Sequence, residues 1–470
     1  MKNGANDILA LKSFALAQAI SDGDISASEA TEAAIARIEQ TDAQVNAFTG
    51  KSYARARREA AAVDAQRARG ALLPTLAGVP YAVKSLFDVE GEVTLAGSKI
   101  NRDHAPAAQD AFLVERMRVA GGVLVGSLNM DEYAYGFTTE NTHYGPCHNP
   151  HDLTRIAGGS SGGCGAAVAA AQVGITLGSD TNGSIRVPSS LCGVWGLKPT
   201  FGRLSRRGSY PFVHSIDHLG PFADSLESLA LVYDALQGAD PLDPGCHATD
   251  VQPVGDVAQG IHGLRVGVLG GYFHDNASDA ALEVVAAVAK ALGSQGTVEW
   301  PDAAEGRAAA FITSAAEGGS LHLADLRTRV EDFEPLSVDR FIAGALMPAS
   351  WYLRAQRFRR VYRDRINALF EHWDVLLAPA TPVCATPIGA EWIDIQGTQH
   401  PARPSMGLLT QPISFAGCPV VAAPMWPGSG TGGLPIGVQI IAAPWREDLA
   451  LRAGYALQHA GLAHTRAVPF

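Results

Sequence analysis

Two segments rich in serine and glycine carry the strongest chemical signal in the sequence. Residues 158–163 read GGSSGG, and residues 178–186 read GSDTNGSIR. Because glycine has no Cβ, several backbone N–H groups can converge on one point in such segments and stabilise a phosphate or the oxyanion of a tetrahedral intermediate. Neither segment has the spacing of a phosphate-binding glycine loop. Oxyanion stabilisation and close packing of the backbone therefore stay open as explanations.

A serine nucleophile fits the second segment better than the first. Residues 158–162 match the Gly-x-Ser-x-Gly elbow in letters, but that turn requires a buried strand directly before it, and residues 148–155 are polar. Ser184 instead follows an apolar segment, residues 175–178, and a short turn. This order predicts a serine at the end of a strand, where its hydroxyl is free to attack a carbonyl.

Lys84 is the candidate base for such a serine. It ends the apolar segment 78–83 and so lies at the mouth of a predicted buried strand. Burial disfavours the charged ammonium and lowers its pKa, which is the shift that a general base near neutral pH requires. A structural ion pair is the alternative for a single lysine. A base and a serine nucleophile together predict acyl transfer.

The elements around these residues alternate between helices and strands. Residues 8–70 have a helical pattern, in which Ser26 and Glu29 form a capping box. From residue 76 onward we expect a strand at 77–83, a helix at 110–120, a strand at 122–126, a helix at 164–173 and strands at 175–178 and 194–197. This alternation is typical of an α/β fold with a parallel or mixed sheet.

The rest of the chain is less regular but shows no boundary between domains. We expect a strand at 264–269, helices at 278–292 and 351–370, and C-terminal strands at 375–378, 419–423 and 434–442. There is neither an internal repeat nor a low-complexity linker. We therefore predict one domain over residues 1–470, with a helical region at 1–70 and a variable, substrate-side segment at 240–375.

Composition excludes several classes of protein. The 470 residues include 36 basic and 47 acidic side chains, which give a net charge of −11, and 47% of the residues are hydrophobic. Such a chain lacks the basic surface that nucleic acid or an anionic membrane requires. We expect no signal peptide and no membrane span, because the apolar segment 166–177 is too short. Six cysteines without CxxC pairs predict reduced thiols and a cytoplasmic location.

One group of residues has the side chains of a metal site without its spacing. His143, Cys147, His148 and His151 are close in sequence, but they fit no zinc pattern and their loop contains two prolines. We therefore expect no metal.

The motifs together resemble the amidase signature family. The resemblance rests on GVPYAVK at 78–84, GGSSGG at 158–163, DTNGSIRVP at 180–188, GLKPT at 196–200 and PIGVQ at 435–439, and it spans nearly the whole chain. It implies one large α/β domain, in which a central mixed β-sheet is covered by helices on both faces. It also implies hydrolysis of a linear amide C–N bond without a cofactor.

The resemblance further implies a Ser–cis-Ser–Lys triad. In that family the nucleophile lies 24 residues after the cis-serine, which selects Ser160 over Ser161. Carried over to this sequence, Ser184 is the nucleophile, Ser160 relays the proton and Lys84 is the base. The backbone N–H groups that would form the oxyanion hole are those of Thr181, Asn182, Gly183 and Ser184.

Asn182 departs from the family pattern, which has glycine there. Its side chain could contact a polar substrate, or the residue could simply tolerate a left-handed backbone. With residues 187–193 and 203–205, Asn182 resembles the branch that hydrolyses 1-carboxybiuret during cyanuric acid breakdown and releases ammonia. That branch implies a small helical partner subunit bound to a homodimeric core. Its anionic substrate calls for a cation, for which Arg186 is a candidate, although an ion pair between Arg186 and Asp180 is the alternative.

Two other functions stay open at this point. The first is a glutaminase-type amidotransferase subunit that supplies ammonia to a partner enzyme, against which Asn182 and the divergent middle segment argue. The second is a binding or scaffold protein without catalysis, against which the intact Lys84, Ser160 and Ser184 argue.

Overall fold

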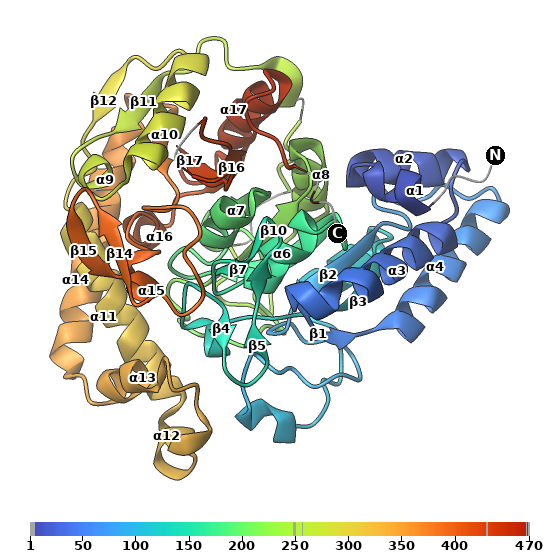
Figure 1. Ribbon diagram of the computed structural model, residues 1–470, viewed down its shortest axis with the longest axis horizontal. Helices are drawn as coiled ribbons and strands as arrows, with labels where there is room; N and C mark the ends of the chain where they lie inside the picture. The colour runs from blue at the N-terminus through green and yellow to red at the C-terminus, as the bar shows by residue number, and fades with distance from the viewer. Residues whose placement is uncertain (1–4, 248–250, 256, 429–430, 467, 469–470) are drawn as a thin grey trace.

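The computed structural model describes residues 5–247, 251–255, 257–428, 431–466 and 468. An eleven-stranded mixed sheet runs through the molecule, and helices flank it (Figure 1). The strand order is β1 (Phe48–Lys51), β3 (Val123–Leu128), β2 (Pro80–Lys84), β8 (Ile175–Asp180), β10 (His218–Ala223), β9 (Trp195–Lys198), β16 (Val420–Met425), β17 (Ile436–Ala442), β13 (Val375–Pro379), β11 (Val266–Leu269) and β12 (Gly296–Val298). The predicted α/β class with a mixed sheet is confirmed.

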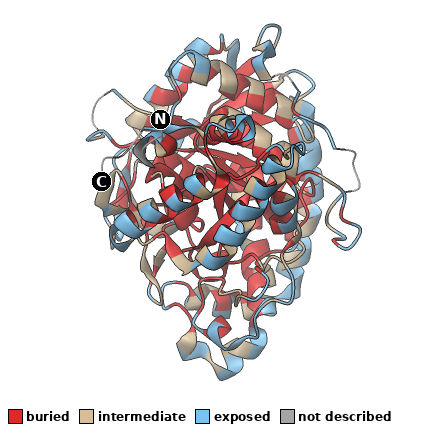
Figure 2. Cartoon of the chain, turned by 90° about the vertical axis from the view of Figure 1, so that its right-hand side faces the viewer, coloured by how far each residue is buried: buried red, intermediate tan, exposed pale blue. Residues whose placement is uncertain are grey.

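Strands β2 and β8, the third and fourth in the sheet, position the candidate chemistry. Strand β2 pairs in parallel with β3 on one side and with β8 on the other, and β8 pairs antiparallel with β10. Every residue of β2, β3, β8 and β10 is buried. Strands buried on both faces must be covered on both faces, and Figure 2 shows the buried residues concentrated in the middle of the molecule beneath exposed outer helices.

The N-terminal helices cover one end of the sheet, at the blue end of the chain in Figure 1. They are α1 (Ala5–Ala10), α2 (Ser13–Asp22), α3 (Ala27–Val45) and α4 (Tyr53–Ala68). The predicted capping box is present at the start of α3, where the side chain of Ser26 accepts a hydrogen bond from the N–H of Glu29 and the Glu29 carboxylate accepts one from Ser26. Strand β1 interrupts the region that we predicted to be helical, because it adds an edge strand to β3.

The two serine-glycine segments each lead into a short central helix. These helices are α6 (Gly162–Ala169) and α7 (Arg186–Cys192), and all residues of both are buried. α5 (Phe112–Val119) lies between β2 and β3 in the chain, while α8 (Leu226–Leu236) and α17 (Glu447–His459) pack against each other and against strands of the sheet.

The segment 240–375 is mostly helical rather than irregular. It contains α9 (Tyr272–Asp275), α10 (Asp279–Ala291), α11 (Ala303–Leu321), α12 (Leu323–Thr328), α13 (Val338–Ala345) and α14 (Ala349–Leu369). The strand predicted at 264–269 and the helices predicted at 278–292 and 351–370 are present as β11, α10 and α14. Helix α11 was not predicted; it packs against α13, α14 and α16 (Gln411–Ala416), and its Ser314 accepts a hydrogen bond from Asn182 in the serine-glycine segment 178–186.

Three pairs of short strands lie outside the main sheet. They are β4 (Glu140–Asn141) with β5 (Gly145–Pro146), β6 (His148–Asn149) with β7 (Asp152–Ile156), and β14 (Trp392–Ile395) with β15 (Thr398–Pro401), the last of which precedes α15 (Ala402–Ser405). In the part of the chain that the structure describes, no helix combines the length and the apolar character needed to cross a membrane.

Candidate active site

Lys84 is at the end of β2, and its amine contacts two serine hydroxyls. Nζ of Lys84 lies 2.7 Å from Oγ of Ser160 and 2.9 Å from Oγ of Ser179. The side chain is 0% exposed, and no ion pair of Lys84 occurs among the residues described, so the structural ion pair considered above is absent there. Burial lowers the pKa of Lys84 to about 8. Lys84 is therefore an amine that can lose its proton near neutral pH.

Ser160 belongs to a tight loop just before α6. The peptide bond between Gly159 and Ser160 is cis. The carbonyl oxygen of Ser160 accepts a hydrogen bond from the backbone N–H of Asp131 at 3.2 Å. A Cβ at position 159 would lie 2.2 Å from Oδ2 of Asp131, so only glycine fits at this close approach. The loop that begins at Asp131 thus packs directly against Ser160.

Ser184 follows β8 in a turn that leads into α7. It is 2% exposed, and its hydroxyl makes no hydrogen bond to any residue that the structure describes. A direct hydrogen bond between Ser160 and Ser184 is therefore not part of this structure. Both hydroxyls belong to loops that border β8, and the hydroxyl of the candidate nucleophile Ser184 has no competing partner among the described residues.

The turn before Ser184 offers three backbone donors rather than four. No acceptor among the described residues takes the N–H groups of Thr181, Asn182 and Ser184, whereas the N–H of Gly183 donates to Oδ1 of Asp180 at 2.8 Å. Gly183 was expected to contribute to the oxyanion hole, but its N–H is already used in the hydrogen bond to Asp180. The Thr181 hydroxyl donates to Oδ1 of Asp217 at 2.6 Å and fixes the start of the turn. Converging free N–H groups of this kind can stabilise an oxyanion.

Arg186 does not face a substrate. It is 0% exposed, and Nε and Nη2 donate to the Asp180 carboxylate, each at 2.9 Å. Nη1 donates to the carbonyl oxygen of Thr410 and to Oε1 of Gln439 at 2.7 Å. Burial alone would raise the pKa of Asp180, but the charge and hydrogen bonds of Arg186 hold it below its usual value. The prediction that Arg186 contacts the substrate is wrong, because its guanidinium is held in an internal ion pair with Asp180 that stabilises the turn.

Ser179 is a residue that the sequence analysis missed. It is the next-to-last residue of β8, and Ser161 contacts its backbone, since Oγ of Ser161 donates to the Ser179 carbonyl oxygen at 3.2 Å. Its hydroxyl is the second hydrogen-bond partner of the Lys84 amine, in addition to that of Ser160. The motif contained this serine, but only the parallel pairing of β2 with β8 brings it to Lys84.

Arg340 on α13 is a second residue that was not predicted, and it supplies a cation next to the loop that contains Asp131 and Tyr135. Its Nη2 donates to the carbonyl oxygens of Tyr135 at 2.8 Å and Leu336 at 3.2 Å, and its guanidinium lies 4.2 Å from the centroid of the Tyr135 ring. Within the described residues no carboxylate forms an ion pair with Arg340, and its Nε and Nη1 have no acceptor. Burial lowers the pKa of Arg340. Tyr135 belongs to the same loop as Asp131, which contacts Ser160.

The residues considered for a metal have separate partners. His148 Nδ1 lies 2.6 Å from the Leu153 carbonyl oxygen, and His151 Nε2 lies 2.9 Å from that of Cys192. Among the described residues no three possible ligands come together as a metal site.

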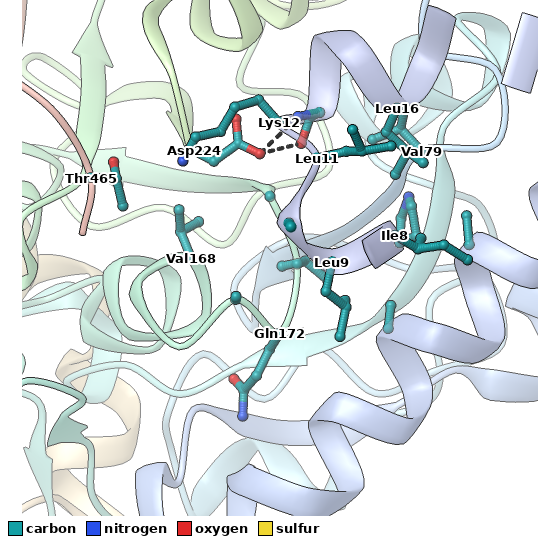
Figure 3. A pocket seen from close by; sticks show the side chains of 18 of the residues that line it. Ile8, Leu9, Leu11, Lys12, Leu16, Val79, Val168, Gln172, Asp224 and Thr465 are labelled. Carbon is teal, nitrogen blue, oxygen red and sulfur yellow. Dashed lines mark hydrogen bonds between the residues drawn. The ribbon is translucent and has the colours of Figure 1, made fainter. Parts of the chain in front are cut away.

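The cavity in Figure 3 is not lined by the catalytic candidates Lys84, Ser160 and Ser184. It has a volume of ≈ 220 Å³ and lies between the N-terminal segment and α6. Ile8, Leu9 and Val168 line it, and Asp224 at its edge accepts hydrogen bonds from the N–H and the hydroxyl of Ser13, both at 2.8 Å. The catalytic candidates Lys84, Ser160 and Ser184 are instead buried near the ends of β2 and β8, where exclusion of water strengthens electrostatic interactions.

Activity should rise with pH because only the neutral amine of Lys84 can accept a proton. With a pKa of about 8, the neutral fraction increases about tenfold per pH unit below that value and saturates above it. We expect kcat/KM for an amide that does not itself titrate to rise about tenfold between pH 6 and pH 7 and to level off above pH 8. A profile that stays flat from pH 6 to pH 9 would contradict the role of Lys84 as base.

Comparison with known proteins places this site in a family. The amidase family model matches residues 29–451. AtzE, which is one of the subunits of the 1-carboxybiuret hydrolase of Pseudomonas sp. (strain ADP), is 66% identical over 457 residues, which cover 97% of this chain and 100% of that protein. A glutamyl-tRNA(Gln) amidotransferase subunit of Moorella thermoacetica is 36% identical over 488 residues, which cover 97% of this chain and 98% of that protein.

Solved structures share the whole fold. A vestigial protein complex that bears on the evolutionary origins of an s-triazine catabolic enzyme, with inhibitor bound, matches with a TM-score of 0.96 and 66% identity, covering 97% of this chain and 100% of that chain. The 6-aminohexanoate cyclic dimer hydrolase with its substrate matches with a TM-score of 0.85 and 29% identity, covering 99% of this chain and 98% of that chain. These matches confirm the resemblance read from the motifs: the chain belongs to the amidase signature family.

Proposed function

We propose that this protein hydrolyses the terminal amide C–N bond of 1-carboxybiuret, or of a closely similar carboxylated urea-like amide, and releases ammonia. The contact that carries the chemistry is the 2.7 Å approach of the buried Lys84 amine to the Ser160 hydroxyl, beside the turn that holds Ser184. The 66% identity to a 1-carboxybiuret hydrolase subunit supports the choice of substrate, whereas the amidotransferase subunits compared are at most 38% identical.

Acylation follows from the order of these groups. The neutral amine of Lys84 accepts a proton from Ser160, and Ser160 accepts one from Ser184 as Oγ of Ser184 attacks the carbamoyl carbon. The carbonyl oxygen becomes an oxyanion, which the free N–H groups of Thr181, Asn182 and Ser184 would stabilise. The C–N bond then breaks, and the departing nitrogen takes the proton from the relay and leaves as ammonia.

Deacylation uses the same relay with water. The intermediate is a carbamoyl ester on Oγ of Ser184. Water loses a proton to the relay, attacks the ester carbon, and restores the Ser184 hydroxyl while a carboxylated product leaves. Ser179 supports both halves of the reaction, because its hydroxyl, 2.9 Å from Nζ, holds the Lys84 amine toward Ser160.

Arg340 takes the place that we had expected for Arg186. A carboxylated substrate needs a cation whose hydrogen bonds are not already used, and the Nε and Nη1 atoms of Arg340 meet this condition with respect to the residues described. Each of these two nitrogens can donate a charge-assisted hydrogen bond to a carboxylate oxygen. We therefore propose that Arg340 holds the substrate carboxylate at the edge of the site formed by the Tyr135 loop.

Replacing Arg340 with alanine should weaken the binding of carboxylated substrates selectively. A charge-assisted hydrogen bond supports an increase in KM of about tenfold to a hundredfold for malonamate. Malonamide, which has no carboxylate, should keep its kcat/KM within about twofold. Arg340→Lys keeps the charge but loses the directed Nε–H and Nη1–H donors of the guanidinium, so it should give an intermediate KM. Equal losses for both substrates would show that Arg340 has only a packing role.

A direct test of the function compares substrates with the purified wild-type enzyme. Ammonia release is measured from freshly prepared 1-carboxybiuret and from allophanate, biuret, malonamate and glutamine. We expect 1-carboxybiuret to have the highest kcat/KM. Preference for glutamine, with turnover that increases when a partner enzyme is added, would instead support the amidotransferase alternative.

We also propose that the enzyme works as a hetero-oligomer in the cytoplasm, with a small helical partner subunit on a homodimeric core. The relative in Pseudomonas is named as one subunit of a hydrolase, and the similar solved structure is a protein complex. All six cysteines of this chain are free thiols, which supports a reducing compartment.

A further inference from the structure

We infer that the side chain of Asn182 selects substrates by accepting a hydrogen bond from an N–H group, and that Ser314 is the positioning residue that fixes its orientation. This inference rests on the proposed function for the identity of the scissile amide. It adds a chemical reason for the preference for ureido compounds over ordinary amides. The two side chains involved are Asn182, in the turn before Ser184, and Ser314, on α11.

The orientation of the Asn182 amide follows from the hydrogen bonds of Ser314. The hydroxyl of Ser314 donates to the carbonyl oxygen of Ala310, one turn earlier in α11, at 2.8 Å. Its single proton is thereby used, so its oxygen can only accept from other groups. The Asn182 side chain contacts that oxygen at 2.8 Å and must therefore present its NH2 group, Nδ2, as the donor.

The other end of the amide has no partner. With Nδ2 held by Ser314, the carbonyl oxygen Oδ1 points away from α11, and it is buried without a hydrogen-bond donor among the described residues. Asn182 as a whole is 7% exposed. A buried acceptor without a donor is unfavourable, so a ligand that brings a donor to it gains a contact that the protein alone lacks.

The backbone places this acceptor at the reacting centre. Asn182 lies two residues before Ser184, and its own N–H is one of the free donors of the turn. Its carbonyl oxygen accepts a hydrogen bond from the Thr410 hydroxyl at 2.6 Å, which fixes the main chain at this residue. The turn therefore offers donors to the scissile carbonyl and one acceptor next to them.

This arrangement suits a substrate with an N–H group beside the scissile carbonyl. Biuret, allophanate and their carboxylated relatives have such an N–H, whereas malonamide and malonamate have a CH2 group at the same position. The members of each pair are nearly isosteric. A site with a buried acceptor rejects the member that leaves it unpaired, and this discrimination is larger than a difference in shape alone would give.

The test measures how far each enzyme prefers N–H over CH2. We would determine kcat/KM for allophanate and malonamate, and inhibition constants for biuret and malonamide against any amide that the enzyme turns over. Asn182→Leu keeps the size without the acceptor, and Asn182→Gly restores the family residue. Both should lower the allophanate-to-malonamate ratio about tenfold relative to wild type. Ser314→Ala should lower it about threefold, because the amide is then free to rotate.

Thr313→Val is the matched control for Ser314→Ala. The Thr313 hydroxyl makes the same kind of bond one turn back, to the Ala309 carbonyl oxygen at 2.8 Å, but does not contact Asn182. The allophanate-to-malonamate ratio of Thr313→Val should therefore equal that of wild type. Folded Asn182 variants that keep the wild-type ratio in both measurements would overturn the inference. Failure of the wild type to hydrolyse 1-carboxybiuret would overturn the proposed substrate instead, and the inhibition constants would still test Asn182.

Discussion

Replacing Ser184 with alanine should abolish amide hydrolysis while leaving the fold intact. We expect kcat to fall by about 10⁴-fold or more, because the serine forms the bond that the reaction requires and no other described hydroxyl occupies the end of the turn. The hydroxyl makes no hydrogen bond to a described residue, so its removal breaks no internal contact. The melting temperature should therefore stay close to that of wild type, and ammonia release is the measurement.

Ser189 offers a matched control for Ser184. It lies five residues later, on α7, and it is 0% exposed with a hydroxyl that has no hydrogen-bond partner among the described residues. Ser189→Ala should keep full activity. Mass spectrometry after treatment with a serine-directed phosphonate gives a second measurement, since wild type and Ser189→Ala should form a covalent adduct and Ser184→Ala should not. An adduct on the Ser184→Ala enzyme would place the nucleophile elsewhere.

The sequence motifs predicted more of the candidate site than the expected helices and strands did. Lys84 and Ser160 belong to segments whose letters are specific, and the structure brings their side chains into contact. The contact of Ser179 with Lys84 could not be predicted, because it depends on which strands are neighbours. Strand β8 is separated from β2 by about ninety residues, and its pairing is set by the packing of the entire sheet.

The site residues of the variable segment could not be predicted from the sequence for a different reason. Arg340 and Ser314 lie in no motif, and their relevance comes from single contacts that the fold creates. Ser314 accepts a hydrogen bond from Asn182, and Arg340 donates one to the Tyr135 carbonyl oxygen. A surface arginine and a functional arginine look the same in sequence. Arg186 shows the converse, since its place in a motif suggested a substrate contact while burial beside Asp180 gives it a structural role.

Replacing Lys84 should be nearly as damaging as replacing Ser184. Lys84→Met keeps the length and the apolar stem of the side chain but has no basic atom, so kcat/KM should fall by about 10³- to 10⁴-fold. Lys84→Arg should fall as far, since a guanidinium stays protonated at any pH at which the enzyme is folded. The residual activity of Lys84→Met should also lose the rise with pH that we expect of the wild type around pH 8.

Lys198 separates a catalytic loss from the effect of altering a buried lysine. It too is 0% exposed, and burial lowers its pKa to about 7, but its amine donates to the Pro199 carbonyl oxygen and hydrogen-bonds neither Ser160 nor Ser184. Lys198→Met should therefore retain the pH profile of wild type, even if its melting temperature falls. If Lys84 acted only by stabilising the sheet, Lys84→Met and Lys198→Met should both lose activity in proportion to their loss of stability. A folded Lys84→Met enzyme with a wild-type rate would show that the serines react without this base.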